Sequence, residues 1–222
     1  EQRKIVREVT LDMAGNMNLI VKKCFPKAMR VIDRFHVQKL AWEAVQDIRI
    51  KHRWETLDAE NKAYKEAKVK GIEYIPEVLP NGDTRRQLLA RSRYLLFKPE
   101  ERWTLAQWNR AQILFELYPD IEKAYKLAYN LYDIYNWKIR PDIARTKLAH
   151  WFNDIEGAGF NAFNTIRRTF ETHHNNIINY FNSRSTNAAA ESFNAKIKDF
   201  RRQFRGVTDV NFFLYRLAKV YA

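Results

Sequence analysis

Cysteine, glycine and proline are scarce in this chain of 222 residues, which has one cysteine, six glycines and six prolines. The single cysteine, Cys24, excludes an internal disulfide and a zinc site built from several thiolates of this chain, and we expect it to be a small buried hydrophobic residue. No apolar run approaches the roughly 18 to 20 residues that span a bilayer, and the charged start lacks the apolar segment of a signal peptide. These absences indicate a cytoplasmic protein without a membrane partner.

Positive charge is what the chain has in excess. Thirty-nine Lys and Arg stand against 26 Asp and Glu, which leaves a net charge of +13. Proteins that meet phosphate backbones have this balance, although ribosomal and membrane-surface proteins share it. The hydrophobic share of 46% is ordinary for a globular protein, so one large domain or a domain with an insertion is expected. Because the chain begins without Met and soon enters a buried-looking strand, we expect it to be a fragment of a longer product.

The N-terminal residues predict two strands joined by a short helix. Residues 7–13 are partly β-branched, residues 17–24 have a helical pattern, and residues 28–35 again resemble a strand. A βαβ unit of this kind pairs its strands in parallel. Asp12 and Asp33 come at the ends of the strands, where ligands bind in open α/β sheets, so both are candidate site residues.

Most of the remaining chain is predicted to be helical. Residues 55–70 extend a first helix as a solvated segment, and residues 71–83 form a loop or small hairpin because they are rich in helix breakers. Residues 85–128 predict two helices divided at Pro99. The tryptophans are interpreted as core residues rather than as surfaces for base stacking. One apolar stripe opens this helical region, at Val37, Leu40, Ala41, Ala44 and Ile48.

A late helix, expected over residues 183–204, has the most informative pattern. Ser185, Thr186 or Asn187 can cap its start. An apolar stripe follows the helical repeat at Phe193, Ile197, Phe200 and Phe204. The opposite side carries Asn187, Glu191, Asn194 and Lys198 at the same spacing. An ordinary amphipathic helix would also have such a polar face.

Glu191 differs from an ordinary surface acid in its surroundings, because small residues and amides flank it and a basic run follows. One carboxylate beside such a run suits a site that acts on phosphates. Carboxylates from a strand end and from a helix are also what Mg²⁺-dependent phosphoryl transfer uses, since Mg²⁺ prefers oxygen ligands. The spacing alone does not join Glu191 to Asp12. The basic run comprises Lys196, Lys198, Arg201, Arg202 and Arg205.

The chain resembles the DDE transposases of bacterial insertion sequences, in particular the ISL3 group, with the Mutator-like transposases as relatives. The resemblance extends over essentially the whole chain. It rests on Asp12-Met13, residues 25–28, the Asp-Arg-Phe-His block within residues 31–37, the stretch 185–198 with its Asn, Glu, Asn and Lys, and Arg205-Gly206.

The resemblance implies a mainly α chain with a small parallel β remnant, namely a partial ribonuclease H-like α/β core interrupted by a large helical insertion. Residues 1–36 would be the partial core, 37–182 the insertion, and 183–222 the C-terminal helices of the core. Asp12 would be the second and Glu191 the third of three catalytic acids, which hold Mg²⁺ (or Mn²⁺), two ions in the intact enzyme. The first acid would lie upstream, so we expect the chain alone to be inactive.

Supporting roles and partners follow from the same resemblance. Asp33 and His36 would support the site together with Asn187 and Asn194, and Asp33 is the alternative second acid. His36 keeps the alternative of a hydrogen-bonded structural histidine. The expected partners are double-stranded DNA, as insertion-sequence ends and target, and a second protomer in a homodimer. The basic run 196–205 would contact this DNA.

A different class of protein fits the same composition. The chain would then be a non-catalytic basic helical module that binds nucleic acid or assembles protomers. Asp12 and Glu191 would be ordinary surface acids in that case.

Overall fold

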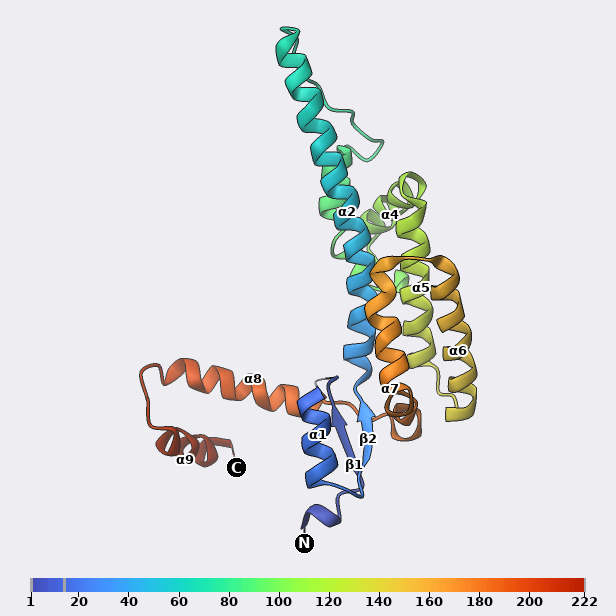
Figure 1. Cartoon of the computed structure of the whole chain (residues 1–222). Helices are drawn as coiled ribbons and strands as arrows, with labels where there is room; N and C mark the ends of the chain where they lie inside the picture. The colour runs from blue at the N-terminus through green and yellow to red at the C-terminus, as the bar shows by residue number, and fades with distance from the viewer. Residues whose placement is uncertain (1, 14, 222) are drawn as a thin grey trace. The chain divides into compact units, whose positions relative to one another are not determined.

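The computed structural model describes residues 2–13 and 15–221, which form two compact units, Glu1–Ser183 and Arg184–Ala222. Most of these residues lie in α-helices, and the strands form one small parallel sheet, so the predicted mainly helical class with a parallel β element is confirmed (Figure 1). Within the described residues, no helix combines the length and apolar character that crossing a membrane requires.

The predicted βαβ unit is confirmed. Strand β1 (Glu8–Leu11) is followed by helix α1 (Gly15–Cys24) and strand β2 (Met29–Ile32), and the two strands pair in parallel from Glu8↔Met29 to Leu11↔Ile32. The second strand is shorter than the predicted 28–35, because Asp33 already caps the next helix. Cys24 is only partly buried at the end of α1, contrary to expectation.

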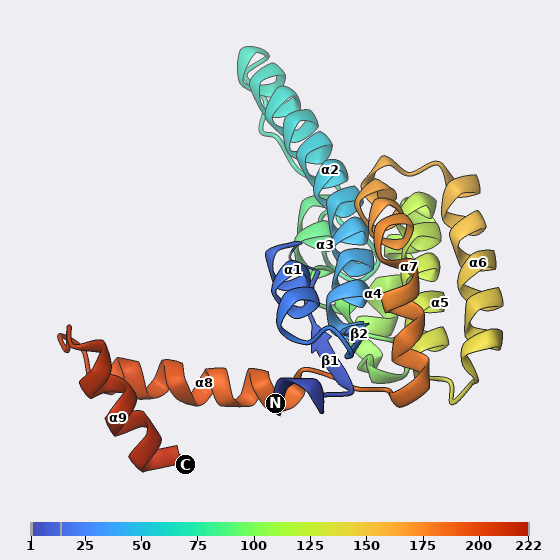
Figure 2. The same cartoon turned by 60° about the horizontal axis from the view of Figure 1, so that its bottom comes forward.

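Helix α2 (Arg34–Val69) is the longest element and leads away from the sheet (Figure 1). The predicted stripe of Val37, Ala41, Ala44 and Ile48 is buried, whereas Leu40 is partly buried. These residues pack against helices α5 (Pro119–Asn136) and α7 (Asn164–Ser183), which lie beside α2 (Figure 2). The segment beyond residue 50 is mostly solvated, as predicted.

The region 85–128 differs from its prediction, because it contains more helices than the two expected. Capping boxes at Thr84 and Thr104 start α3 and α4, and Pro119 occupies the first turn of α5. Pro99 precedes only a short 3₁₀ turn. The remaining elements of the first unit are η1 (Gln2–Lys4), α3 (Arg85–Arg91), η2 (Leu95–Phe97), η3 (Glu100–Arg102), α4 (Leu105–Leu117), α6 (Pro141–Ala158) and η4 (Asn161–Phe163).

The predicted loop over residues 71–83 is confirmed. It contains one isolated antiparallel bridge, Val78↔Thr84, and Gly82 has a φ of 80°, which a glycine adopts without strain in the turn after Asn81. The loop connects the solvated end of α2 to α3.

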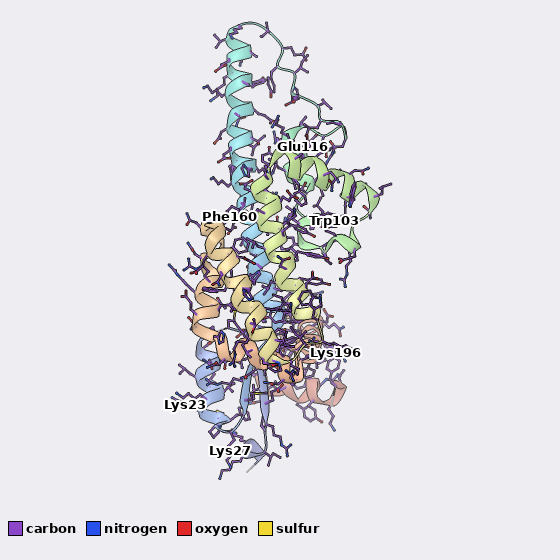
Figure 3. All side chains as sticks on the ribbon, turned by 90° about the vertical axis from the view of Figure 1, so that its right-hand side faces the viewer. Lys23, Lys27, Trp103, Glu116, Phe160 and Lys196 are labelled. Atoms are coloured by element: carbon purple, nitrogen blue, oxygen red, sulfur yellow. The ribbon has the colours of Figure 1, made fainter. Side chains whose placement is uncertain are left out.

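The tryptophans divide between core and surface. Trp42 and Trp151 are buried, and Trp103 packs partly buried against the core. Figure 3 shows the side chain of Trp103 near the η2–η3 segment. The core interpretation is wrong for the other three, because Trp54, Trp108 and Trp137 are 62%, 48% and 45% exposed.

The second unit consists of α8 (Ala188–Gln203) and α9 (Val210–Tyr221). The predicted apolar stripe holds for the C-terminal part of α8, where Phe200 is buried and its ring lies 4.4 Å from that of Phe204 and 5.4 Å from that of Phe213. Phe193, at the N-terminal end of the stripe, is 45% exposed. The stripe therefore serves mainly to pack α8 against α9.

Candidate functional site

The carboxyl edge of the small sheet brings Asp12 and Asp33 to the same place in the fold. The strand register pairs Leu11 with Ile32, so the two aspartates are the next residues along adjacent parallel strands. The backbone N–H of Asp33 donates to the carbonyl of Leu11 at 3.1 Å, which ties the two strand ends together. Two carboxylate-bearing residues thus leave the sheet at the edge where ligands bind in parallel sheets.

Asp33 has a structural task at this edge. It is 2% exposed, and its Oδ1 accepts a hydrogen bond of 2.9 Å from the backbone N–H of Phe35, which caps the start of α2. Asp12, by contrast, is only partly buried. Asp12 is therefore the more accessible of the two carboxylates for a ligand from solution.

His36 lies in the first turn of α2, close to Asp33 in the chain. Its backbone N–H donates to the carbonyl of Asp33 at 3.2 Å, and its ring packs edge-on against Phe35 with centroids 5.7 Å apart. The side chain is partly exposed, so it can support either a structural contact or the neighbouring carboxylates.

Two exposed lysines of the first unit lie away from this edge. Lys23 lies in the last turn of α1 and Lys27 shortly precedes β2, so both lie near the amino end of the second strand. Figure 3 shows them at the far end of the sheet from α2. Neither lysine therefore lies beside the carboxylates of Asp12 and Asp33.

Glu191 lies in the first turn of α8 and is exposed. Its backbone N–H donates to the carbonyl of Asn187 at 2.8 Å, and Asn187 immediately precedes the helix. The partial positive charge of a helix N-terminus favours a carboxylate at this position. Asn194 is exposed one turn further on, so Asn187, Glu191 and Asn194 follow one another along one face of the helix start.

Four of the five predicted DNA-contacting residues surround one cavity of the second unit. Its volume is about 960 Å³, it lies between α8 and α9, and Asp209 is the acid in its lining. The fifth residue, Lys196, lies instead over the ring of Tyr221, with its Nζ 5.9 Å from the ring centroid. The four cations are Lys198, Arg201, Arg202 and Arg205.

The donors present suit Mg²⁺ by type, since carboxylate oxygens are the ligands that this hard cation prefers. Asp12 and Asp33 belong to the first unit and Glu191 to the second. Within the part of the chain that the structure describes, no three His, Cys, Asp or Glu side chains gather as a metal site. Each unit by itself therefore offers a partial set of oxygen donors.

Sequence reasoning missed a cavity that begins directly after Asp33. Its volume is about 470 Å³, and residues from α2, the η2–η3 segment and α5 line it. The signal in the sequence was the pair Arg34-Phe35, a cation and an aromatic residue following a candidate acid, but only the fold reveals what faces them.

Comparison with known proteins gives a consistent result. The sequence model of a family described as a transposase, the ISL3-type DDE group, matches residues 1–217. The chain is also similar to the transposase for insertion sequence element IS1001 of Bordetella parapertussis, with 22% identity over 213 residues. That match covers 96% of this chain and 47% of the relative, so the chain spans about half the length of this curated relative. No solved structure matches the chain.

Proposed function

The chain belongs to the ISL3 family of DDE transposases, and we propose that it supplies two of the three acids with which the whole protein cleaves and joins DNA at insertion-sequence ends. The observation that carries this proposal is the position of Asp12, which directly follows β1 at the carboxyl edge of a parallel sheet. Glu191, exposed in the first turn of α8, supplies the other acid. Family membership is what joins these two residues.

The proposed chemistry is in-line attack on phosphodiesters, first by water and then by a 3′-hydroxyl. Bound Mg²⁺ or Mn²⁺ ions would activate the attacking hydroxyl and stabilise the leaving oxygen. Asp12 and Glu191 would hold these ions. Asp33 and His36 would keep Asp12 in place, and Asn187 and Asn194 would flank Glu191.

The proposed fold of the whole catalytic core is ribonuclease H-like. Residues 1–36 supply part of its sheet, residues 37–182 form the insertion, and residues 183–222 return the chain to the core. Support comes from the parallel β1–β2 pair, from its acidic carboxyl edge, and from an acid-bearing late helix separated from that sheet by α2 to α7. The first acid would lie on a strand upstream of this chain.

The cavity of the second unit supports a proposal of a second role for the same chain. Lys198, Arg201, Arg202 and Arg205 line it, so we propose that it contacts the DNA backbone. The rival function, a basic module without catalysis, would use this surface alone. It would bind DNA with a steep dependence on salt and would need no divalent metal.

The experiment that tests the proposal compares this 222-residue chain with the same chain extended upstream along its reading frame. Both are incubated with Mg²⁺ and duplex DNA that carries insertion-sequence ends, and nicked products are resolved on a denaturing gel. We expect cleavage by the extended protein and none by the shorter chain, because the proposal places the first acid upstream of the shorter chain. Binding of the ends by the extended protein without any cleavage would favour the non-catalytic module.

A further inference from the structure

The cavity beside the acidic edge has aromatic walls. Trp42 and Tyr135 are buried in its lining at 7% and 2% exposure, whereas Phe35 and Phe97 are 58% and 38% exposed. Burial raises the pKa of Tyr135 well above its usual range, so its ring stays neutral. Exposed aromatic faces at the mouth of an apolar cavity are surfaces on which a flat ring can stack, and stacking would remove them from water.

Cations surround the same cavity. Arg34, Lys39 and Arg102 belong to its lining, and the lining contains no acidic residue. Arg34 donates to Oδ1 of Asn136 at 2.9 Å, which is a neutral partner. Lys39 has Glu43 at 3.6 Å, but both side chains are about half exposed, so that ion pair is weak. The rim therefore favours an anionic group.

One polar atom at the wall lacks a partner. Gln38 lines the cavity, and its Nε2 donates to the carbonyl of Ala128 at 2.9 Å. Its Oε1 is buried and accepts no hydrogen bond within the described residues. A buried acceptor in this state is unfavourable until a donor reaches it. The edge of a nucleobase carries such N–H donors.

We propose that this cavity binds one unstacked nucleotide of a DNA strand, with its base against the aromatic walls and its phosphate at the cationic rim. The volume of about 470 Å³ lies in the range of small-molecule sites. The position supports a strand nucleotide, because Arg34 directly follows Asp33 and the cavity thus begins at the edge where cleavage is proposed. This inference rests on the proposed function for its choice of DNA as the source of the nucleotide.

Binding of a labelled single-stranded oligonucleotide by the 222-residue chain, followed by fluorescence anisotropy without divalent metal, tests this inference. Stacking is worth about 1–3 kcal/mol per base, so Phe35→Ala should weaken binding about 5- to 150-fold. The slope of the logarithm of the binding constant against the logarithm of the salt concentration should stay unchanged for this variant. Arg102→Gln should instead reduce that slope by about one.

Trp54→Ala is the matched control, because Trp54 is an aromatic residue on the same helix, 62% exposed and outside the cavity. It should leave the affinity within about twofold, and far-UV circular dichroism should show both variants folded. An equal affinity of Phe35→Ala and the wild type would overturn the site. If free adenosine monophosphate displaces the oligonucleotide at a concentration as low as that of the oligonucleotide itself, the cavity is a site for free nucleotides. That result would overturn the proposal that it binds a nucleotide of a DNA strand. If the wild type binds no DNA, the proposed function itself fails.

Discussion

Glu191→Gln is expected to lower the rate of DNA strand cleavage about a thousandfold or more in the protein that is extended upstream along its reading frame. A carboxylate that holds a catalytic metal contributes several kcal/mol of transition-state stabilisation, and about 4 kcal/mol corresponds to a factor of a thousand. Gln keeps the size of the side chain but removes its charge. The exposed position in the first turn of α8 means that the fold should tolerate the change. The rate of cleavage is measured in a single turnover, with the protein already bound to the insertion-sequence ends of the DNA.

Asp199→Asn is the control for this variant. Asp199 is an exposed acid on the same helix, paired with Arg202 at 3.5 Å, and an exposed pair contributes little. Its replacement should change cleavage less than about twofold and leave DNA binding intact. Glu191→Gln should likewise keep its affinity for DNA. Undiminished cleavage by Glu191→Gln would remove this residue from the catalytic set.

Asp12→Asn should lower the rate of cleavage about as strongly as Glu191→Gln does. Asp33→Asn should lower that rate less than about tenfold. The reason lies in the different surroundings of the two carboxylates. Asp12 is only partly buried, but Asp33 is 2% exposed and caps α2 through Phe35. Asn caps a helix about as well as Asp, so Asp33→Asn should keep the helix start intact.

Stability separates a structural effect at Asp33 from a catalytic one. Asp33→Ala removes the cap and should reduce the free energy of unfolding by about 1 kcal/mol, measured with urea, while Asp33→Asn should not. If Asp33→Asn abolishes cleavage at unchanged stability and Asp12→Asn does not, Asp33 is the second acid instead.

Patterns within short segments of the sequence predicted the strands of the βαβ unit and the start of the long helix. The β-branched residues within the segment 7–13 indicated a strand, and the helical stripe from Val37 to Ile48 indicated a helix buried on one side, so both elements could be predicted before the fold was known. The ends of both strands could be predicted in the same way, and these ends place Asp12 and Asp33 at one edge of the sheet. Parallel pairing needed only the length of the connecting segment.

Other features depend on helix caps and on tertiary packing, which the spacing of apolar residues does not show. The division of residues 85–128 was set by the capping of Thr104 with Gln107 and not by Pro99. The spacing of the α8 stripe did not show which of its residues are buried, because Phe200 packs against Phe213 of α9 whereas Phe193 is 45% exposed. The cavity next to Asp33 joins α2 to residues far along the chain, so only tertiary structure shows it.

Backbone cleavage by Fe²⁺ bound in place of Mg²⁺ measures most directly whether Asp12 and Glu191 hold the same ion, because hydroxyl radicals formed at bound iron cut the nearest peptide segments. In the protein extended upstream, we expect cuts both around Asp12 and around Glu191, and we expect both sets to disappear together in Glu191→Gln. Cuts around only one of the two residues, or an unchanged pattern in the variant, would show that they do not share a metal site.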